Sequence, residues 1–245
     1  MAYQNVFRRY EIKYLLNAAQ KEAVLAAIAP HMQRDKYGRT TICNLYFDTE
    51  NYRLIRRSLE KPLYKEKLRL RSYGRATEDG TVFAEIKKKF KSVVYKRRIG
   101  LPNSEAMAWL CQNGPLPRDT QIGREIEAFR EFYGELTPKV FLSYEREAYY
   151  MKDGSDFRVT FDENVLCRRD RLSLTEAADG DRILPEGLTL MELKCSGGIP
   201  LFLTSVLSKH KIFKASFSKY GTAYSTLIFP EVKEQKQYEF VSGNL

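Results

Sequence analysis

A strict alternation of basic and apolar residues near the middle of the chain places the strongest constraint on the fold. Residues 67 to 71 read Lys67-Leu68-Arg69-Leu70-Arg71. Successive side chains of a β-strand point to opposite faces, so three cations share one face of this segment and two leucines share the other. An ordinary amphipathic strand does not need three long cations in a row. The pattern therefore predicts a strand whose basic face has a function.

The same alternation of charges recurs along the sequence. It is found at Glu85-Ile86-Lys87-Lys88-Lys89, Lys96-Arg97-Arg98, Tyr144-Glu145-Arg146, Arg158-Val159-Thr160-Phe161-Asp162 and Glu192-Leu193-Lys194. If these strands form one sheet that closes on itself, their charged faces converge on a common interior. Lys96 and Arg98 would line that interior, and Arg97 would point outward. An interior rich in Lys and Arg, with a few carboxylates, suits a polyanion held by a metal ion.

Length, charge and cysteine usage narrow the possible classes of protein and of binding partner. The 245 residues are enough for one β-rich domain with a sizeable core. The formal net charge of +10 favours an anionic partner: nucleic acid, phosphorylated metabolites, polyphosphate or an acidic membrane surface. Four scattered cysteines and two histidines argue against a Cys/His zinc site and for a reduced, cytoplasmic setting. No apolar stretch has the length of a signal peptide or a membrane span.

Hydrophobic periodicity and turn signals predict about eight strands and six helices. We expect strands at Val6–Leu16, 41–47, Tyr64–Tyr73, Thr81–Phe90, 93–101, 139–150, 157–166 and 188–194, and helices at 17–30, 49–59, 104–111, Gln121–Tyr133, 200–213 and 218–227. Asn17 and Gln20 have the spacing of a capping box at the first helix. Residues 170–187 are expected to form a surface loop. We expect one domain over 1–230, followed by a polar tail at 231–245.

About eight mostly antiparallel strands can close into a barrel. The expected fold is therefore α+β, with an antiparallel closed β-barrel whose interior is polar and basic. The leucines and isoleucines opposite the charges would face outward, where helices can cover them. Tyr46, Phe47, Phe83, Phe141 and Phe161 occupy strand positions at which core packing, and not stacking on nucleic-acid bases, is the default.

Eight short segments carry a resemblance to a known family. They are Glu11-Ile12-Lys13, Asn44-Leu45-Tyr46-Phe47-Asp48-Thr49, Lys67-Leu68-Arg69-Leu70-Arg71, Glu85-Ile86-Lys87, Tyr144-Glu145-Arg146, Arg158-Val159-Thr160-Phe161-Asp162, Met191-Glu192-Leu193-Lys194 and Phe217-Ser218-Lys219-Tyr220. In this order they resemble the polyphosphate polymerase domain of the vacuolar transporter chaperone (VTC) family, which is part of the CYTH-like, triphosphate tunnel metalloenzyme superfamily. The superfamily begins with Glu-x-Glu-x-Lys, whereas this chain has Arg9-x-Glu11-x-Lys13. Loss of one acidic residue disfavours a hydrolytic triphosphatase.

The resemblance assigns roles to individual residues. It implies phosphate ligands at Lys13, Arg69, Arg71, Lys87, Arg146, Arg158 and Lys219, neutral hydrogen-bond donors at Tyr144 and Ser218, and a Mg or Mn ligand at Glu192. Lys89, Lys96, Arg98 and Lys194 are further candidates for substrate contact. Glu11 and Glu85 either bind a second metal ion or pair with neighbouring cations. These residue types suit the task, because Arg grips two phosphate oxygens, Lys is a compact charge, and a hard cation prefers carboxylate oxygen.

The resemblance implies a metal-dependent polymerase that acts on ATP and inorganic polyphosphate. The chemistry needs positioning and charge neutralisation but no Ser/His pair. Two alternatives remain open: a triphosphatase of the same fold, and a module that binds polyphosphate or inositol phosphate without catalysis. A nucleic-acid binder is disfavoured, because charges inside a tunnel cannot reach a duplex.

Overall fold

The computed structural model of the chain describes residues 6–91 and 93–231, with side chains from residue 10 onward. The strands are β1 (Val6–Leu16), β2 (Met32–Arg34), β3 (Thr40–Asp48), β4 (Tyr64–Tyr73), β5 (Thr81–Phe90), β6 (Val93–Pro102), β7 (Thr137–Met151), β8 (Arg158–Arg168), β9 (Asp181–Arg182) and β10 (Thr189–Cys195). The helices are α1 (Ala18–Ile28), α2 (Arg53–Leu59), α3 (Asn103–Cys111), α4 (Gln121–Tyr133), α5 (Leu201–Lys209) and α6 (Lys219–Ala223), which continues into the π-helix η1 (Tyr224–Ile228).

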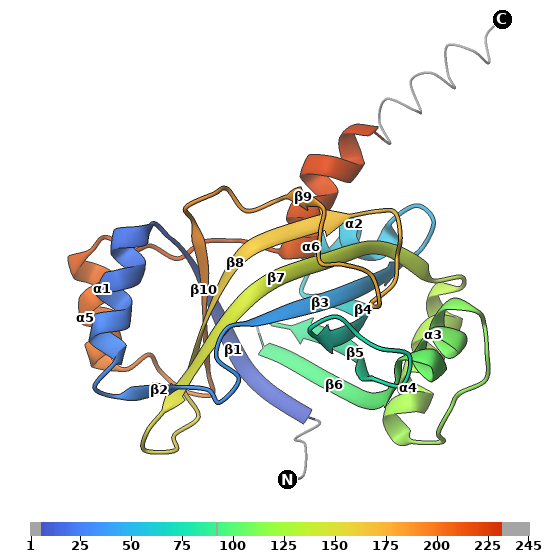
Figure 1. The fold of residues 1–245 in the computed structure, drawn as a ribbon, viewed down its shortest axis with the longest axis horizontal. Coiled ribbons are helices and arrows are strands. Elements are labelled where there is room, and N and C mark those ends of the chain that lie inside the picture. Colours follow the sequence, from blue (N-terminus) through green and yellow to red (C-terminus); the bar gives the residue numbers. More distant parts are fainter. Residues whose placement is uncertain (1–5, 92, 232–245) are drawn as a thin grey trace, which may run out of the picture.

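All strands belong to one antiparallel sheet, in the order β2-β7-β3-β4-β5-β6-β1-β10-β8-β9, with an additional pairing between β7 and β8 (Figure 1). Through this additional pairing, β7 and β8 contact each other although they lie near opposite ends of the order. The structure confirms an α+β fold with one large antiparallel sheet. The predicted closed barrel stays a proposal, which the β7–β8 pairing supports.

The apolar face of the sheet is covered by helices on the outside, as predicted. Leu68 and Leu70 of β4 are fully buried in a cluster with Trp109 of α3 and with Ile126 and Phe129 of α4. A second cluster joins β1, β8 and β10 to α1 and α5, and a third lies beneath α6 and η1. Figure 1 shows α1 and α5 side by side on one flank and α3 and α4 on the other. Because the leucines of β4 face the helices, its basic side chains lie on the inner face of the sheet.

Local signals set several helix ends. The predicted capping box of α1 is present, because the Asn17 side chain accepts from the Gln20 amide while the Gln20 side chain accepts from the Asn17 amide. The helix expected to start at 49 begins instead at Arg53, since Tyr52 has a left-handed backbone with φ of 58°. Asp48 still caps this helix, accepting from the amides of Leu54 and Ile55 at 2.8 and 3.0 Å.

Apart from Glu231, the predicted tail at 231–245 lies outside the described residues. Within the described ranges, no helix has both the length and the apolar character needed to cross a membrane.

Candidate functional site

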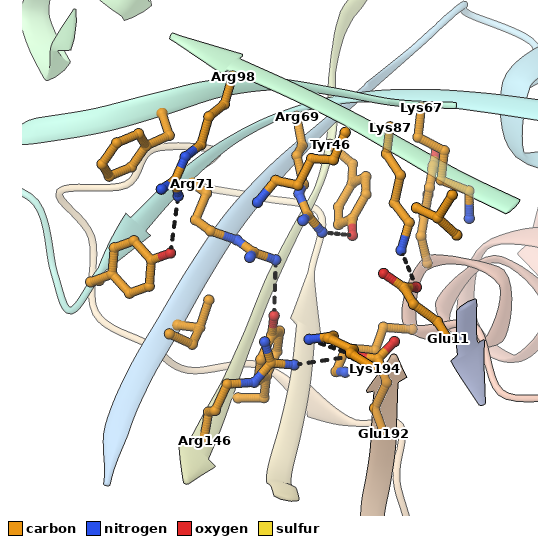
Figure 2. Close-up of a pocket in the computed structure, with 18 of the residues that line it drawn as sticks. Glu11, Tyr46, Lys67, Arg69, Arg71, Lys87, Arg98, Arg146, Glu192 and Lys194 are labelled. Carbon is orange, nitrogen blue, oxygen red and sulfur yellow. Dashed lines mark hydrogen bonds and ion pairs between the residues drawn. The ribbon is translucent and has the colours of Figure 1, made fainter. Parts of the chain in front are cut away.

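The inner face of the sheet encloses a cavity of about 1520 Å³ whose lining is strongly basic. Fifteen lysines and arginines line it, against four carboxylates. Figure 2 shows Arg69, Arg71, Lys87, Arg146 and Lys194 converging from different strands on one space. Like charges gathered in this way repel one another unless an anion joins them. The electrostatics of the cavity therefore favour a polyanionic ligand.

The structure brings nearly all of the predicted site residues to this cavity. It is lined by Glu11, Lys13, Arg69, Arg71, Lys87, Lys89, Lys96, Arg98, Tyr144, Arg146, Arg158, Glu192, Lys194, Ser218 and Lys219. Period-two alternation explains this convergence, because the charged positions of each strand lie on the concave face. The neighbouring Arg97 points outward as predicted and pairs with Glu125 of α4 at 2.5 Å.

Glu85 is the predicted site residue that does not line the cavity. Its side chain is fully buried and contacts Arg69 at 2.8 Å, Lys96 at 2.5 Å and Arg71 at 3.9 Å. Burial raises the pKa of the Glu85 carboxyl, but Arg71, Arg69 and Lys96 outweigh this effect and lower the pKa below its usual range. Of the two roles left open for Glu85, the contacts favour pairing with cations. Glu85 fixes the two arginine side chains from below the cavity surface.

A second buried carboxylate, that of Asp162, binds cations of β7 and α6. Asp162 of β8 accepts two hydrogen bonds from Arg146 of β7, at 2.6 and 2.7 Å, and one from Lys219 of α6 at 2.5 Å. Burial raises the pKa of Asp162, but Arg146 and Lys219 lower it to about 2. The carboxylate is therefore charged at neutral pH and orients both cations. Bidentate geometry of this kind fixes the plane of the guanidinium group.

Glu192 is surrounded by cations at longer distances. Its carboxylate lies 3.2 Å from Lys194, 3.8 Å from Arg146 and 3.9 Å from Lys13. Burial raises the pKa of Glu192, but Lys194, Lys13, Lys87 and Arg146 hold it well below the usual range. On the neighbouring strand, Glu11 accepts from Lys87 at 2.5 Å. Glu192 thus presents an ionised carboxylate inside the cavity.

The donor set fits a divalent cation that is bound jointly with phosphate. Among the described residues, no three His, Cys, Asp or Glu side chains form a group that could hold a metal ion. A protein cage is therefore absent from that part of the chain. Mg²⁺ is usually held by one or two carboxylates together with substrate phosphates, and Glu192 with the nearby Glu11 matches this arrangement. Burial and the nearby Glu192 raise the pKa of Glu11, but Lys87, Lys194 and Lys13 outweigh them and lower it, so Glu11 also presents an ionised carboxylate.

Two lysines of the cavity are bound to the segment that precedes α6. Lys13 donates to the Phe217 carbonyl oxygen at 2.7 Å, and Lys67 donates to the Ser218 hydroxyl at 3.1 Å. Burial lowers the pKa of Lys13 to about 8, and burial together with Lys13 and Lys87 lowers that of Lys67 to about 7. Both ammonium groups are destabilised in the ligand-free protein. A phosphate group would favour their charged forms.

Tyr144 lies among three cations. Its hydroxyl accepts from Arg71 at 3.0 Å, and its ring is 4.2 Å from the Lys219 ammonium and 5.0 Å from the Arg146 guanidinium. Burial raises its pKa, but Arg146, Arg71 and Lys219 lower it to about 8. The resemblance assigned this hydroxyl as a donor to phosphate, and the structure places it in the cavity.

The sequence prediction did not assign Lys67, Arg118 or Asp162 to the site; Lys67 and Arg118 line the cavity, and Asp162 is buried behind the Arg146 and Lys219 side chains. Lys67 belongs to the alternation at 67–71 and points into the cavity with Arg69 and Arg71, so the period-two pattern alone was sufficient to find it. Asp162 was visible as the last residue of the motif that begins at Arg158. Arg118 lies in an irregular segment between α3 and α4 and lines the cavity without a periodic signal.

The fold and the cavity define an α+β protein whose single large antiparallel sheet surrounds a basic cavity. A candidate adenylate cyclase from Bacillus halodurans has a similar structure, with a TM-score of 0.54 and 14% identity over 88% of this chain and 96% of that one. A candidate adenylyl cyclase from Hippeastrum, described as having a dominant triphosphatase activity, matches with a TM-score of 0.52 and 18% identity over 89% and 96%. These likenesses concern the fold. The VTC domain family matches residues 8–228, and the chain belongs to this family. No curated protein matches the sequence significantly.

Proposed function

We propose that the protein is a metal-dependent polyphosphate polymerase. It would transfer the γ-phosphoryl group of ATP to the end of a growing polyphosphate chain within the basic cavity. A terminal oxygen of the chain attacks the γ-phosphorus, the bond from this phosphorus to the β,γ-bridging oxygen breaks, and ADP leaves with the bond electrons. Membership of the VTC domain family supports phosphate chemistry. The observation that carries the proposal is the excess of fifteen cations over four carboxylates around one cavity.

The residues of the cavity supply positioning and charge neutralisation, which dominate catalysis of phosphoryl transfer. Arg69 and Arg146 are held by Glu85 and Asp162, so their guanidinium groups are oriented before substrate binds. Lys13, Lys67 and Lys87 neutralise charge on the transferred group and on its neighbours. An attacking phosphate oxygen is already ionised, so no general base is required. Glu192 would hold Mg or Mn, which would supply positive charge to stabilise the transferred phosphoryl group.

A growing polyphosphate chain needs a path through the protein as well as a site for phosphoryl transfer. We propose that the pairing of β7 with β8 closes the sheet into a tunnel through which the polymer passes. This closure would separate the polyphosphate from bulk water and strengthen every charge interaction inside the tunnel.

Product analysis with ATP and Mn²⁺ tests the proposal. We expect long-chain polyphosphate and ADP in equal phosphoryl equivalents, and no product when the metal is chelated. Release of orthophosphate alone would identify the second candidate, a triphosphatase, which the fold of the Hippeastrum relative favours. Tight binding of polyphosphate without turnover would identify a binding module. Either result overturns the polymerase proposal.

A further inference from the structure

The two ends of the cavity differ in chemistry. At one end, here called the lysine end, the lining includes Lys65, Lys67, Lys89 and Ser218. At the other, here called the aromatic end, it includes Ile42, Tyr73, Phe83, Arg98, Gly100 and Pro102. The strand register separates them, since Lys65 pairs with Lys89 whereas Arg71 pairs with Phe83. Lys65 and Arg71 are six positions apart on β4, which corresponds to roughly 20 Å along the strand.

The aromatic end is an organised surface. The rings of Tyr73 and Phe83 meet edge to face, with centroids 5.8 Å apart, and the Arg98 guanidinium lies 4.6 Å from the Phe83 centroid. Arg98 also donates to the Tyr73 hydroxyl at 3.4 Å (Figure 2). Tyr73 is 53% exposed, so part of its ring is open to a ligand. Aromatic rings beside a guanidinium group form a stacking platform for a nucleobase.

Gly100 keeps this surface open. It is the register partner of Phe83 on β6, and a Cβ atom at this position would lie 3.4 Å from Cε1 of Phe83. Any larger side chain would crowd the ring. The expected core packing is correct for Tyr46, Phe47, Phe141 and Phe161, although Tyr46 also lines the cavity, as does the largely buried Phe83. Of the two rings at the aromatic end, Tyr73 has the larger exposed surface, which the apolar part of a ligand can contact.

We propose that the aromatic end binds the base of the nucleoside triphosphate donor, and that the lysine end receives the polyphosphate. The inference rests on the proposed function for the identity of the donor. Two residues along a strand span about 7 Å, so Arg71 and Arg69 lie about 7 and 13 Å from Tyr73 along the same face. A base held at Tyr73 directs its phosphates toward Arg71 and then toward Arg69. At the lysine end Tyr220 also lines the cavity, but it is only 2% exposed, so this end offers a nucleobase less ring surface than Tyr73 does.

The test compares a triphosphate ligand that carries a nucleoside with one that does not. Calorimetry with Mg²⁺ measures the dissociation constants of a non-hydrolysable ATP analogue and of tripolyphosphate. Tyr73→Ala should weaken binding of the analogue about tenfold while tripolyphosphate binds as before. Tyr73→Phe keeps the ring and should restore the wild-type ratio. Lys89→Ala is the matched control at the other end, and it should weaken binding of long polyphosphate without changing that ratio.

The outcomes separate this inference from the polymerase proposal. An unchanged ratio in Tyr73→Ala overturns the inference and leaves the polymerase proposal standing. A selective loss of the ATP analogue supports the inference even if the wild-type protein makes no polyphosphate, a result that would overturn only the proposed activity. A wild-type protein that binds tripolyphosphate tightly but not the ATP analogue overturns both.

Discussion

Arg146 and Asp162 are register partners across the pairing of β7 with β8, and their side chains form a two-point ion pair over that same junction. Lys219 brings the start of α6 to the same carboxylate. One buried charge thus joins α6 to two strands that lie near opposite ends of the sheet order. The carboxylate orients phosphate-binding cations and also stabilises the fold.

Asp162→Asn should destabilise the ligand-free protein. The substitution leaves Arg146 and Lys219 without their buried partner, which costs about 3 kcal/mol of the free energy of unfolding. Because the pKa of Asp162 is lowered to about 2 from 3.8, the wild-type contribution is present above pH 3.8 and is lost as the pH falls through about 2. Urea unfolding at pH 7 and at pH 3 measures both effects. Equal stability of the two proteins at pH 7 would rule out this role.

The two faces of β4 and β5 should respond differently to a negative charge. Leu70→Asp places an unpaired carboxylate in the core beneath α3 and α4, and we expect it to unfold the protein. Lys89→Asp lies on the cavity side and should leave the melting temperature within a few degrees. It should weaken tripolyphosphate binding at low salt, measured by calorimetry. A folded Leu70→Asp protein would show that the inner and outer faces are assigned the wrong way round.

The lowered pKa of Lys67 predicts that ligand affinity and stability depend on pH near neutrality. Burial, Lys13 and Lys87 lower its pKa from 10.5 to about 7, so it loses its proton as the pH rises from 6 to 8. Affinity for tripolyphosphate should fall over this range. The unfolded chain keeps the proton up to about 10.5, so the ligand-free protein should gain stability as the pH rises above 7. Lys67→Met should flatten both profiles, and profiles identical to those of the wild type would contradict the assignment.

Glu192→Gln should separate binding from synthesis. The substitution keeps the side-chain volume and removes the charge assigned to the metal ion. Tripolyphosphate should still bind in the absence of metal, and more tightly, because Lys194, Lys13 and Arg146 lose a competing anion. Synthesis from ATP should fall by orders of magnitude. Wild-type synthesis with unchanged metal dependence would show that the metal binds elsewhere.

Tripolyphosphate should stabilise the protein strongly. A ligand at about 100 times its dissociation constant adds roughly 2.7 kcal/mol to the free energy of unfolding. The same concentration of sulfate should give a smaller rise in melting temperature, since sulfate spans fewer cations. Differential scanning fluorimetry at low salt compares the two anions, and an unchanged melting temperature with tripolyphosphate would count decisively against a phosphate site.

Much of the fold could be predicted because its strands are long and strictly alternating. The bounds of β1, β4, β5 and α4 agree with the sequence prediction. The strands β2 and β9 were missed: they have three and two residues, too few for a periodic pattern to emerge. They form only where β7 and β8 offer a partner edge, which is a tertiary effect.

The candidate site was predictable to the extent that strand alternation controls it. Alternation places Glu85 on the same face as Lys87, yet Arg69 and Lys96 from the flanking strands cover its carboxylate and remove it from the cavity surface. Phe83 and Tyr46 are buried, as their pattern predicts, but both also line the cavity. Their position at the cavity depends on how the sheet curves, which local sequence does not encode.

The hydrogen bonds from Lys13 and Lys67 to the oxygens of Phe217 and Ser218 have a consequence for substrate loading. In both hydrogen bonds the acceptor is a neutral oxygen, and a phosphate oxygen is a stronger acceptor. The segment before α6 and an incoming phosphate chain therefore compete for the same two donors. Ligand binding in the cavity and attachment of this segment are thermodynamically linked. A bound ligand therefore weakens the contacts that hold the segment before α6 against Lys13 and Lys67.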